Sequence, residues 1–428
     1  MEQFDVIIAG AGLAGLAAAS TLASEGLEVL ILERGDYPGA KNVTGGRIYV
    51  NPLRGLFPDL FDSAPLERPV VSESSVLMAR ERSVTLSYSG DELRAEPYQS
   101  HSILRAKFDR WLAERAEAKG AMLMTKARVD DLIQERGAVV GVRVGEEELR
   151  APVVIACDGV LSLIAEKAGL RKPASHHHYA LGIKEVIGLD PGVINDRFNL
   201  EGNEGAARLF VGEATGGLFG GGFLYTNRES LSLGIVVGMK SFLESGSSPD
   251  APELFELFRN RPEIRPLIQG GTPLEYAAHV ISEGGYRALG PFHGPGILLA
   301  GDAAGLTLNM GVTVRGMEYA LASGSCAARA VLRARETGDF GSDGLSVYTA
   351  LLEDSFVLKD FKAFQETSTV LNNPRFFRHY PELVGAILAD IYRVPAGPKE
   401  RLFPTVRKRL TTRELLHQAK DLWEVRKI

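Results

Sequence analysis

The stretch FDVIIAGAGLAGLAAASTLASEGLEVLILE, residues 4–33, decides the fold of this chain. Its apolar start, residues 4–9, is typical of a buried parallel strand. The turn Gly10-Ala11-Gly12-Leu13-Ala14-Gly15 follows, and alanine-rich sequence to about Glu25 predicts a helix. Residues 28–32 predict a second buried strand, which ends on Glu33. Together these elements indicate a βαβ unit that binds a dinucleotide.

Each part of this unit has a physical role. We expect Gly10 to allow the tight turn, Gly12 to let the backbone approach a pyrophosphate, and Gly15 to let helix and strand pack closely. The helix N-terminus offers free N–H groups and a partial positive charge to phosphates. Glu33 stands where an acid accepts hydrogen bonds from a ribose. The alternative is a glycine-rich turn in an ordinary α/β domain, and the complete set of elements disfavours it.

Length and cysteine content limit the class of protein. A chain of 428 residues suffices for two or three domains, and 45% hydrophobic residues is ordinary for a globular protein. We expect no signal peptide and no stretch apolar enough to span a bilayer. Two cysteines cannot form a disulfide framework, which predicts a reducing, cytoplasmic setting. They also cannot hold an iron–sulfur cluster, which usually takes four thiolates.

Charge is unevenly distributed along the chain. Residues 399–428 contain nine Lys or Arg against four Asp or Glu, a net charge of +5. The whole chain carries −6, which leaves −11 for the remainder. A basic tail on an acidic body fits an acidic partner or an anionic membrane surface, and a solvated helical face is the alternative.

Two basic segments lie close to the nucleotide unit in sequence. The loop after Glu33 contains Lys41, Asn42 and Arg47, which offer donors to phosphate or ring oxygens unless the loop is a solvated surface turn. Residues 104–119 have the spacing of an amphipathic helix that begins near Arg105. A cation is unfavourable at a helix N-terminus, so Arg105 indicates either a bound anion or an exposed side chain.

Two later strands are expected to rejoin the nucleotide-binding sheet. Residues 152–156 predict a buried strand that runs into Asp158-Gly159, and residues 296–300 predict another that runs into Gly301-Asp302. Before the first of these, short strands predict a β-meander at 121–126, 129–135, 139–144 and 148–151.

Asp302 follows the last buried strand, and a glycine loop and a helix at 315–335 come after it. This arrangement suits a ligand with a polyol chain and a polar ring edge. We expect Asp302 to accept hydrogen bonds from ribityl hydroxyls, and N–H groups near Gly311 and Val312 to face the anionic edge of a flavin. The sequence has no second GxGxxG unit, which a nicotinamide-binding domain would normally carry. We therefore expect one permanently held dinucleotide that receives its electrons from elsewhere.

The middle of the chain leaves the nucleotide fold. Glycines beside aromatics at 216–225 suit a backbone lying flat against a ring or lipid tail, or a bulged strand. His176-His177-His178 makes a poor metal triad, because successive strand residues point to opposite faces. Cys157 and Cys326 are expected to be packing residues. Strands of a second sheet are predicted at 75–78, 83–88 and 231–237, short helices at 249–268, and helices only over the last part of the chain.

These motifs together resemble the FixC family, relatives of electron transfer flavoprotein–ubiquinone oxidoreductase. GxGxxG and Gly-Asp motifs are shared by many flavoproteins. The more specific runs are Lys41-Asn42-Val43-Thr44-Gly45-Gly46-Arg47 and Gly220-Gly221-Gly222-Phe223-Leu224-Tyr225. The resemblance extends to at least Arg378-His379-Tyr380-Pro381-Glu382-Leu383, so it covers nearly the whole chain.

The resemblance implies a mixed α/β (α+β) fold. Its parts are a glutathione-reductase-type Rossmann domain that binds FAD, an inserted β-sheet domain that faces quinone or substrate, and a helical C-terminal region that docks on a partner or a membrane surface. We expect the FAD-binding domain at 1–50, 101–175 and 286–340, the β-sheet domain at 51–100 and 176–285, and the helical region at 341–428.

The resemblance also implies partners. An electron-transfer-flavoprotein-like heterodimer of the FixA/FixB type would donate electrons, and quinone would accept them. The iron–sulfur cluster, which fused relatives carry in a C-terminal ferredoxin-like domain, would reside on a separate ferredoxin-like protein, FixX. We expect a cytoplasmic protein, peripheral at the inner face of the cell membrane, with no nucleic-acid partner.

The resemblance and the motifs together nominate site residues. No metal site and no catalytic side chain is nominated, since the flavin supplies the chemistry. Two alternatives stay open: a self-contained FAD-dependent reductase or monooxygenase of the geranylgeranyl reductase or aromatic hydroxylase type, and a docking subunit that only relays electrons within a complex. The quinone positions carried over are Gly220 and Gly221, and the expected FAD-binding residues are Gly10, Ala11, Gly12, Leu13, Ala14, Gly15, Glu33, Arg34, Lys41, Asn42, Gly46, Arg105, Val129, Asp158, Gly159, Gly301, Asp302, Gly311 and Val312.

Overall fold

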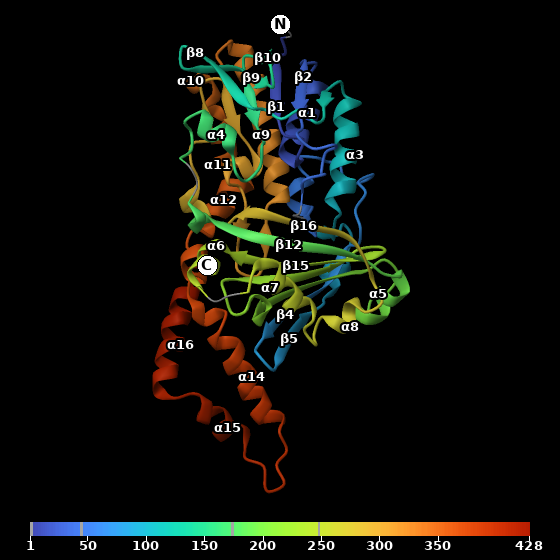
Figure 1. Cartoon of the computed structure of the whole chain (residues 1–428), viewed down its shortest axis with the longest axis vertical. Coiled ribbons are helices and arrows are strands. Elements are labelled where there is room, and N and C mark those ends of the chain that lie inside the picture. Colours follow the sequence, from blue (N-terminus) through green and yellow to red (C-terminus); the bar gives the residue numbers. More distant parts are fainter. Residues whose placement is uncertain (1–2, 43–45, 173–174, 247–248) are drawn as a thin grey trace.

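The computed structural model describes residues 3–42, 46–172, 175–246 and 249–428. Val43, Thr44 and Gly45 of the predicted loop motif lie outside the described residues. A parallel sheet with its helices occupies one end of the molecule, a larger sheet crosses the middle, and an arm of helices extends from the other end (Figure 1).

The first sheet has six strands in the order β17-β18-β11-β1-β2-β7. β1 lies between β11 and β2 and pairs with both in parallel. The four central strands are fully buried, which explains their continuous apolar sequences. The strands are β1 (Val6–Ala9), β2 (Val29–Leu32), β7 (Met122–Met124), β11 (Val154–Ala156), β17 (His293–Gly294) and β18 (Ile297–Leu299).

Helices and a small sheet surround this parallel sheet. α1 (Leu13–Ser24) packs against α3 (Arg105–Glu117) and α9 (Met317–Thr337). An antiparallel sheet of β8 (Asp131–Glu135), β9 (Ala138–Val144) and β10 (Glu147–Arg150) contacts β11 through β9. One continuous apolar core joins these elements.

The prediction for residues 121–126 is wrong in one respect. They do not belong to the β-meander, because β7 pairs in parallel with β2, with Leu30 opposite Met122. The intervening α3 returns the chain to the same edge of the sheet, as a crossover between parallel strands does. The meander therefore has the three strands β8, β9 and β10.

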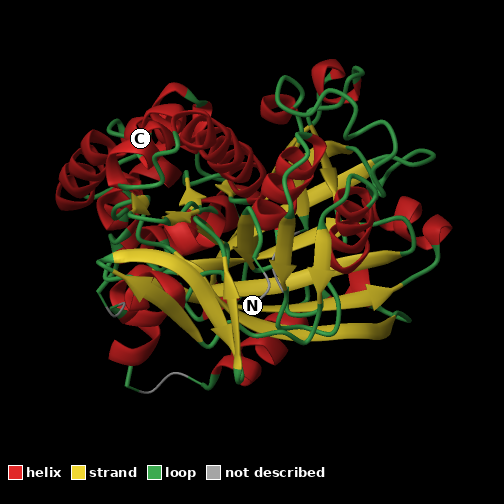
Figure 2. Cartoon of the chain, turned by 90° about the horizontal axis from the view of Figure 1, so that it is seen from above, coloured by secondary structure: helices red, strands yellow, loops and turns green. Residues whose placement is uncertain are grey.

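The second sheet has seven strands in the order β16-β12-β15-β14-β13-β4-β5 (Figure 2). It contains all three strands predicted at 75–78, 83–88 and 231–237, and it has an apolar core of its own. Its strands are β4 (Val70–Met78), β5 (Ser83–Tyr88), β12 (Tyr179–Gly188), β13 (Gly205–Gly212), β14 (Gly220–Thr226), β15 (Ser230–Gly238) and β16 (Thr272–Ser282). Short helices flank it: α5 (Pro191–Phe198), α6 (Met239–Glu244), α7 (Ala251–Arg259) and α8 (Arg265–Ile268).

Smaller elements complete the chain. His176–His178 forms an exposed 3₁₀ helix, η2, rather than a strand, and no group of metal-ligating side chains occurs among the described residues. Two-stranded pairs are β3 (Arg47–Tyr49) with β6 (Ser100–Ser102), and β19 (Leu308–Asn309) with β20 (Val314–Arg315). The remaining helices are α2 (Asp91–Arg94), α4 (Leu163–Lys167), α10 (Ser342–Leu345), α11 (Val347–Asp354), α12 (Phe356–Ala363), α13 (Thr367–Leu371), α14 (His379–Tyr392), α15 (Leu402–Arg409) and α16 (Thr412–Val425).

Candidate functional site

A cavity of about 1340 Å³ is lined by residues of both large sheets and of the C-terminal helices. Ordinary small-molecule pockets measure about 300–1,000 Å³, so this cavity has room for a dinucleotide and a second ligand. It brings together every residue nominated from the sequence except Gly15. A Cβ atom on Gly15 would lie 2.0 Å from the carbonyl oxygen of Gly10, so Gly15 serves the packing of α1 on the turn.

The glycines of the first turn divide into two kinds. Gly10 has a φ of +109°, and a Cβ atom there would lie 2.3 Å from the carbonyl oxygen of Cys157. Gly12 has no atom within 4 Å of the position of a Cβ. α1 begins at Leu13 with no side-chain cap, so its first N–H groups face the space beside Gly12. Gly10 is therefore required by the fold, whereas Gly12 keeps space open in the cavity.

The acid at the end of β2 is held by the backbone. Glu33 accepts hydrogen bonds from the N–H of Ala11 at 2.9 Å and the N–H of Gly35 at 2.6 Å. The carboxylate therefore lies against the glycine turn and lines the cavity, as the predicted ribose acceptor should.

Arg105 is buried and paired rather than exposed. Its guanidinium donates two hydrogen bonds of 2.7 Å to Asp109, one turn later in α3. Asn42 donates to the same carboxylate at 2.7 Å. Burial lowers the pKa of Arg105 and the Asp109 carboxylate raises it, with a net upward shift. Arg105 is thus a fixed cation on the cavity wall, oriented by an acid that sequence reasoning had not assigned to it.

Two acids at strand ends point to a polar ligand. The Oδ2 atom of Asp158 accepts from the N–H of Ile164 at 3.1 Å, whereas its Oδ1 atom is buried without a partner among the described residues. Asp302 accepts from the Thr307 hydroxyl at 3.1 Å. Burial raises the pKa of both carboxyls. Since buried polar atoms are normally satisfied, the orphaned oxygen of Asp158 fits a ligand that donates a hydrogen bond.

The loop after Asp302 lines the cavity with a different hydrogen-bond pattern from the one expected. The N–H of Gly311 donates to Oδ1 of Asn309 at 2.9 Å, so that donor is already engaged. Val312 is largely exposed beside it. Both residues border the cavity, and a Cβ on Gly311 would have only Ile428 nearby, at 3.9 Å.

Gly220 and Gly221 line the cavity from β14. A Cβ on Gly220 would lie 2.0 Å from the carbonyl oxygen of Val236, and one on Gly221 would lie 2.4 Å from that of Phe210. The neighbouring strands therefore already require glycine at both positions. Any role in ligand contact comes in addition to this packing.

Sequence reasoning missed residues that the second sheet contributes. β16 was not predicted, yet His279, Ile281 and Glu283 all line the cavity from it and from the residue after its end. Lys184 of β12 is buried at the cavity and pairs with Glu275 at 3.2 Å. Burial lowers the pKa of Lys184, which Glu275 opposes. The spacing of His279, Ile281 and Glu283 at every second position is the sequence pattern from which this strand face could have been predicted.

The C-terminal helices form a further wall of the cavity that was not predicted. α16 contributes Leu415, Leu422 and Val425, and α14 contributes Leu383 and Ile387. The wall is therefore mostly apolar, with Tyr380, Gln418 and Asp421 as its polar members. It contrasts with the cradle, the group of glycines and acids that includes Gly12, Glu33 and Asp158.

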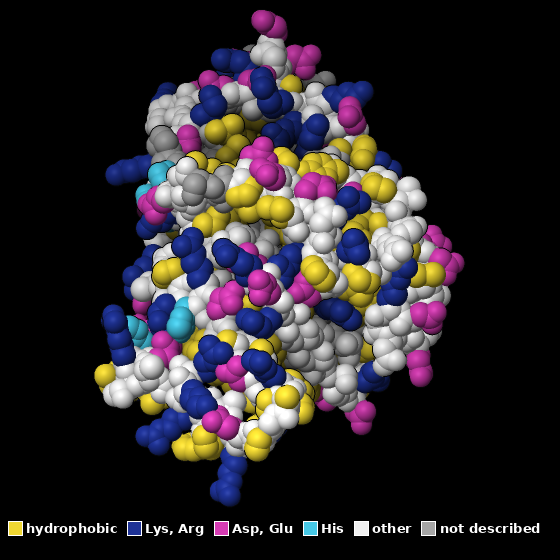
Figure 3. Space-filling view, turned by 60° about the horizontal axis from the view of Figure 1, so that its bottom comes forward, with side chains coloured by type: hydrophobic (Ala, Val, Ile, Leu, Met, Phe, Trp, Pro, Cys, Tyr) yellow, Lys and Arg dark blue, Asp and Glu magenta, His cyan; other side chains and the backbone are white. Residues whose placement is uncertain are grey.

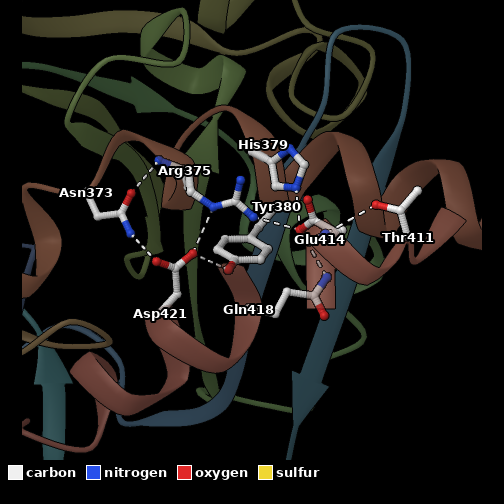
Figure 4. A network of polar contacts seen from close by, with 8 residues as sticks. All are labelled: Asn373, Arg375, His379, Tyr380, Thr411, Glu414, Gln418 and Asp421. Carbon is white, nitrogen blue, oxygen red and sulfur yellow. Dashed lines mark hydrogen bonds and ion pairs between the residues drawn. The ribbon is translucent and has the colours of Figure 1, made fainter. Parts of the chain in front are cut away.

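A polar cluster fastens α16 to the start of α14 (Figure 4). Arg375 donates to Asp421 at 2.8 Å and to Glu414 at 2.6 Å. His379 bonds Glu414 at 2.8 Å, and Tyr380 donates to Asp421 at 2.5 Å. These contacts keep the pKa of Glu414 and of Asp421 low even though burial acts in the opposite direction. Arg375 is the centre of this cluster because it bonds both Glu414 and Asp421 of α16.

The cavity fits FAD on its own geometry. The open space at Gly12, the carboxylate of Glu33 and the orphaned oxygen of Asp158 suit a pyrophosphate, a ribose and hydroxyl donors respectively. Residues 3–195 match the family described as FAD binding domain. The fold and the cavity define an FAD-dependent oxidoreductase.

Relatives at high identity specify the family. The protein named "Probable electron transfer flavoprotein-quinone oxidoreductase YdiS" of Escherichia coli (strain K12) is 43% identical over 399 residues, 93% of this chain and 92% of the relative. Protein FixC of the same organism is 45% identical over the same shares, and Protein FixC of Azorhizobium caulinodans is 38% identical over 404 residues, again 93% and 92%. The chain belongs to the FixC family of electron transfer flavoprotein-quinone oxidoreductase-like proteins.

Solved structures share the fold at low identity. A geranylgeranyl bacteriochlorophyll reductase-like protein from Thermoplasma acidophilum superposes with a TM-score of 0.74 at 19% identity, covering 99% of this chain and 100% of that one. The flavin-dependent brominase Bmp2 gives a TM-score of 0.60 at 17% identity over 91% of each chain. These likenesses confirm the predicted mixed α/β fold.

Substitution of Gly12 tests how the cradle approaches its cofactor. We expect Gly12→Val to retain the thermal stability of the cofactor-free protein, because no atom lies within 4 Å of the new Cβ. FAD affinity should fall about tenfold or more, since the side chain enters the space for the pyrophosphate. The measurements are the flavin absorbance of purified protein and its thermal melting.

Gly55→Val is the matched control, because Gly55 also has no atom within 4 Å and lies outside the cavity lining. A Gly12→Val protein that keeps its full FAD content would show that the cofactor does not approach this turn.

Substitution of Arg375 tests the attachment of α16. We expect Arg375→Met to raise amide hydrogen exchange in α16 about tenfold, because hydrogen bonds to charged groups contribute about 1.5–3 kcal/mol. Exchange in the parallel sheet should not change. Arg413→Met, an exposed position on the same helix, is the control. Equal exchange in both variants would mean that apolar packing alone holds α16.

Proposed function

We propose that this chain accepts electrons from an electron-transfer-flavoprotein-like heterodimer of the FixA/FixB type, acting with a ferredoxin-like FixX protein, and passes them to a quinone. FAD, when bound, takes up electrons singly and releases them in pairs, which suits a two-electron acceptor. The side chains of this chain hold the cofactor, position the acceptor beside it and exclude water.

The continuity of the cavity is the observation that carries this proposal. The cradle at Gly12 and Asp158 opens into a chamber lined by apolar and aromatic side chains, including Phe219, Phe223 and Phe377. A ligand in that chamber lies in the same cavity as the cofactor, so no separate channel is needed for electron transfer. A quinone has a polar ring and an apolar tail, which match a chamber that is polar at the cradle end and apolar toward α14 and α16.

The cysteines support a separate iron–sulfur partner. The sequence has two, Cys157 after β11 and Cys326 inside α9, whereas a cluster usually takes four thiolates. Burial raises the pKa of the Cys326 thiol to about 11 and raises the pKa of Cys157 as well, so neither favours the thiolate. These two residues therefore offer no iron–sulfur site, which supports the proposal that a separate protein carries the cluster.

An anaerobic optical titration tests the donor and the acceptor. NADH alone should leave the FAD of the purified chain oxidised, because the sequence carries no second nucleotide-binding unit. Reduced electron-transfer-flavoprotein-like heterodimer with FixX should bleach the flavin, and a soluble quinone should restore its absorbance.

Fast bleaching by NADH or NADPH alone would instead indicate a self-contained reductase. Oxidation by oxygen only in the presence of an aromatic substrate would indicate a monooxygenase. Transfer of electrons that never reach quinone would indicate a docking subunit.

We further propose that the arm formed by α14, α15 and α16 lies on an anionic membrane surface, where a lipid-borne quinone is found. Tyr392 is 80% exposed, Phe403 75% and Trp423 57%. Figure 3 shows apolar side chains beside Lys and Arg at this end of the molecule. Exposed apolar side chains with basic neighbours are typical of a surface that binds acidic lipid headgroups. No helix in the described part of the chain meets the length and hydropathy needed to cross a bilayer.

Vesicle flotation of the FAD-bound chain tests this surface. We expect binding to phosphatidylglycerol-containing vesicles, little binding to phosphatidylcholine alone, and loss of binding at high salt as the basic residues are screened. Phe403→Ser should weaken binding about tenfold. Leu274→Ser, at an exposed leucine of β16, is the control. Equal flotation of the two variants would exclude the arm as the contact.

A further inference from the structure

Reduction of a quinone to a quinol consumes two protons as well as two electrons, so under the proposed function the cavity needs a proton supply. His279, Ile281 and Glu283 lie at every second position along β16 and just beyond it, which places them on one face. All three line the cavity. His279 lies near Asp302, whose charge raises its pKa against the effect of burial, whereas Glu283 lies beside Asn309 at the end of β19.

Glu283 lines the cavity next to the exposed 3₁₀ helix η2. Its backbone N–H donates to the carbonyl oxygen of His178 at 2.8 Å, and His178 is exposed in η2. Its carboxylate accepts a long hydrogen bond of 3.5 Å from Asn309. Asn309 in turn accepts from the N–H of Gly311, in the loop that lines the cavity. Glu283 therefore connects the exposed η2 with the loop that lines the cavity.

The surroundings of Glu283 leave its carboxyl free to change protonation state near neutral pH. Burial raises the pKa of Glu283 from 4.5 to about 7, and the Asn309 amide opposes the shift. The titratable groups on the elements around this end of β16 include His178 of η2 and Tyr179 of β12. They also include Arg287, which pairs with Glu366 at 2.6 Å, and Arg315 of β20, which pairs with Glu318 and Asp360. None of them is a cause of the shift. Glu283 is therefore not fixed in one charge state by an ion pair.

We propose that Glu283 carries protons from solvent to the quinone site during reduction. The donor protein supplies the two electrons through the cofactor. The Glu283 carboxyl gives one proton to a quinone oxygen, its O–H bond breaks, and the new O–H bond forms on the acceptor. The carboxylate then takes a proton from water at the His178 side, and a second passage completes the quinol.

The pH dependence of quinone reduction tests this role in the FAD-bound chain. Wild-type rates should fall with rising pH above about 7, up to tenfold per pH unit, because only the protonated carboxyl donates. Glu283→Gln should reduce quinone about a hundredfold more slowly at pH 6, since general acid–base groups accelerate reactions by about 10²–10⁴. Its rate should no longer fall above pH 7. Glu283→Asp should keep this fall above pH 7, at a lower overall rate. Glu146→Gln, at an exposed position of the loop before β10, should behave as wild type.

The midpoint potential of the bound FAD gives a second readout that needs no quinone. Its slope against pH should change near pH 7 in the wild type and in Glu146→Gln, and the size or position of this change should differ in Glu283→Gln. FAD absorbance confirms that each variant is folded and loaded. A Glu283→Gln protein with the wild-type rate profile and the wild-type break would overturn the proposal. If no donor drives quinone reduction in any variant, the proposed function fails, and the potentials alone still decide on Glu283.

Discussion

The close contact of backbones around α1 is the constraint on which the rest of the structure depends. A Cβ on Gly324 of α9 would lie 2.1 Å from the carbonyl oxygen of Ala14, and a Cβ on Gly15 would lie 2.0 Å from that of Gly10. α1 is therefore held between the first turn and α9 with no room for side chains. This contact fixes where the N-terminus of α1 points, and hence where the partial positive charge of the helix meets the cavity. The acids after β2, β11 and β18 lie around that point because parallel strands end at the same edge of a sheet.

The parts of the site that could be predicted are those with a local signature. Buried parallel strands, a glycine turn and an acid at a strand end are readable within about 30 residues, and all of them lie where expected. Arg105 was read as a ligand for an anion or as exposed, whereas its partner Asp109 is one turn away in the same helix. A cation at a helix N-terminus does need a negative charge beside it, but the buried carboxylate of Asp109 provides that charge as well as a bound anion would. β7 was predicted as a strand but placed in the wrong sheet, because its partner β2 lies about 90 residues earlier in the sequence and nothing local identifies it. The three histidines of η2 were treated as a strand, and three residues are too few for a pattern to distinguish a strand from a turn.

The apolar wall could not be predicted because it depends on contacts between distant segments. Asn373 and Asp421 are 48 residues apart, and nothing in either segment identifies the other as its partner. The sequence of the last part of the chain indicated helices. It did not indicate whether a face of such a helix covers a core, a membrane or a cavity. In the structure Leu422 of α16 lines the cavity and is also largely exposed, so one helix serves the chamber and the outer surface together.

The order in which the cavity is assembled has a consequence for biosynthesis. β1 is made long before β18 (Ile297–Leu299) joins its sheet, and α16 (Thr412–Val425) follows later still. On the ribosome, a nascent chain therefore exposes an incomplete cofactor site until β18 and α16 have been made. The cofactor can be enclosed only after residues 412–425 have left the exit tunnel. The cofactor-free chain is accordingly the species that chaperones and proteases meet first, and the supply of FAD at that moment influences how much protein survives.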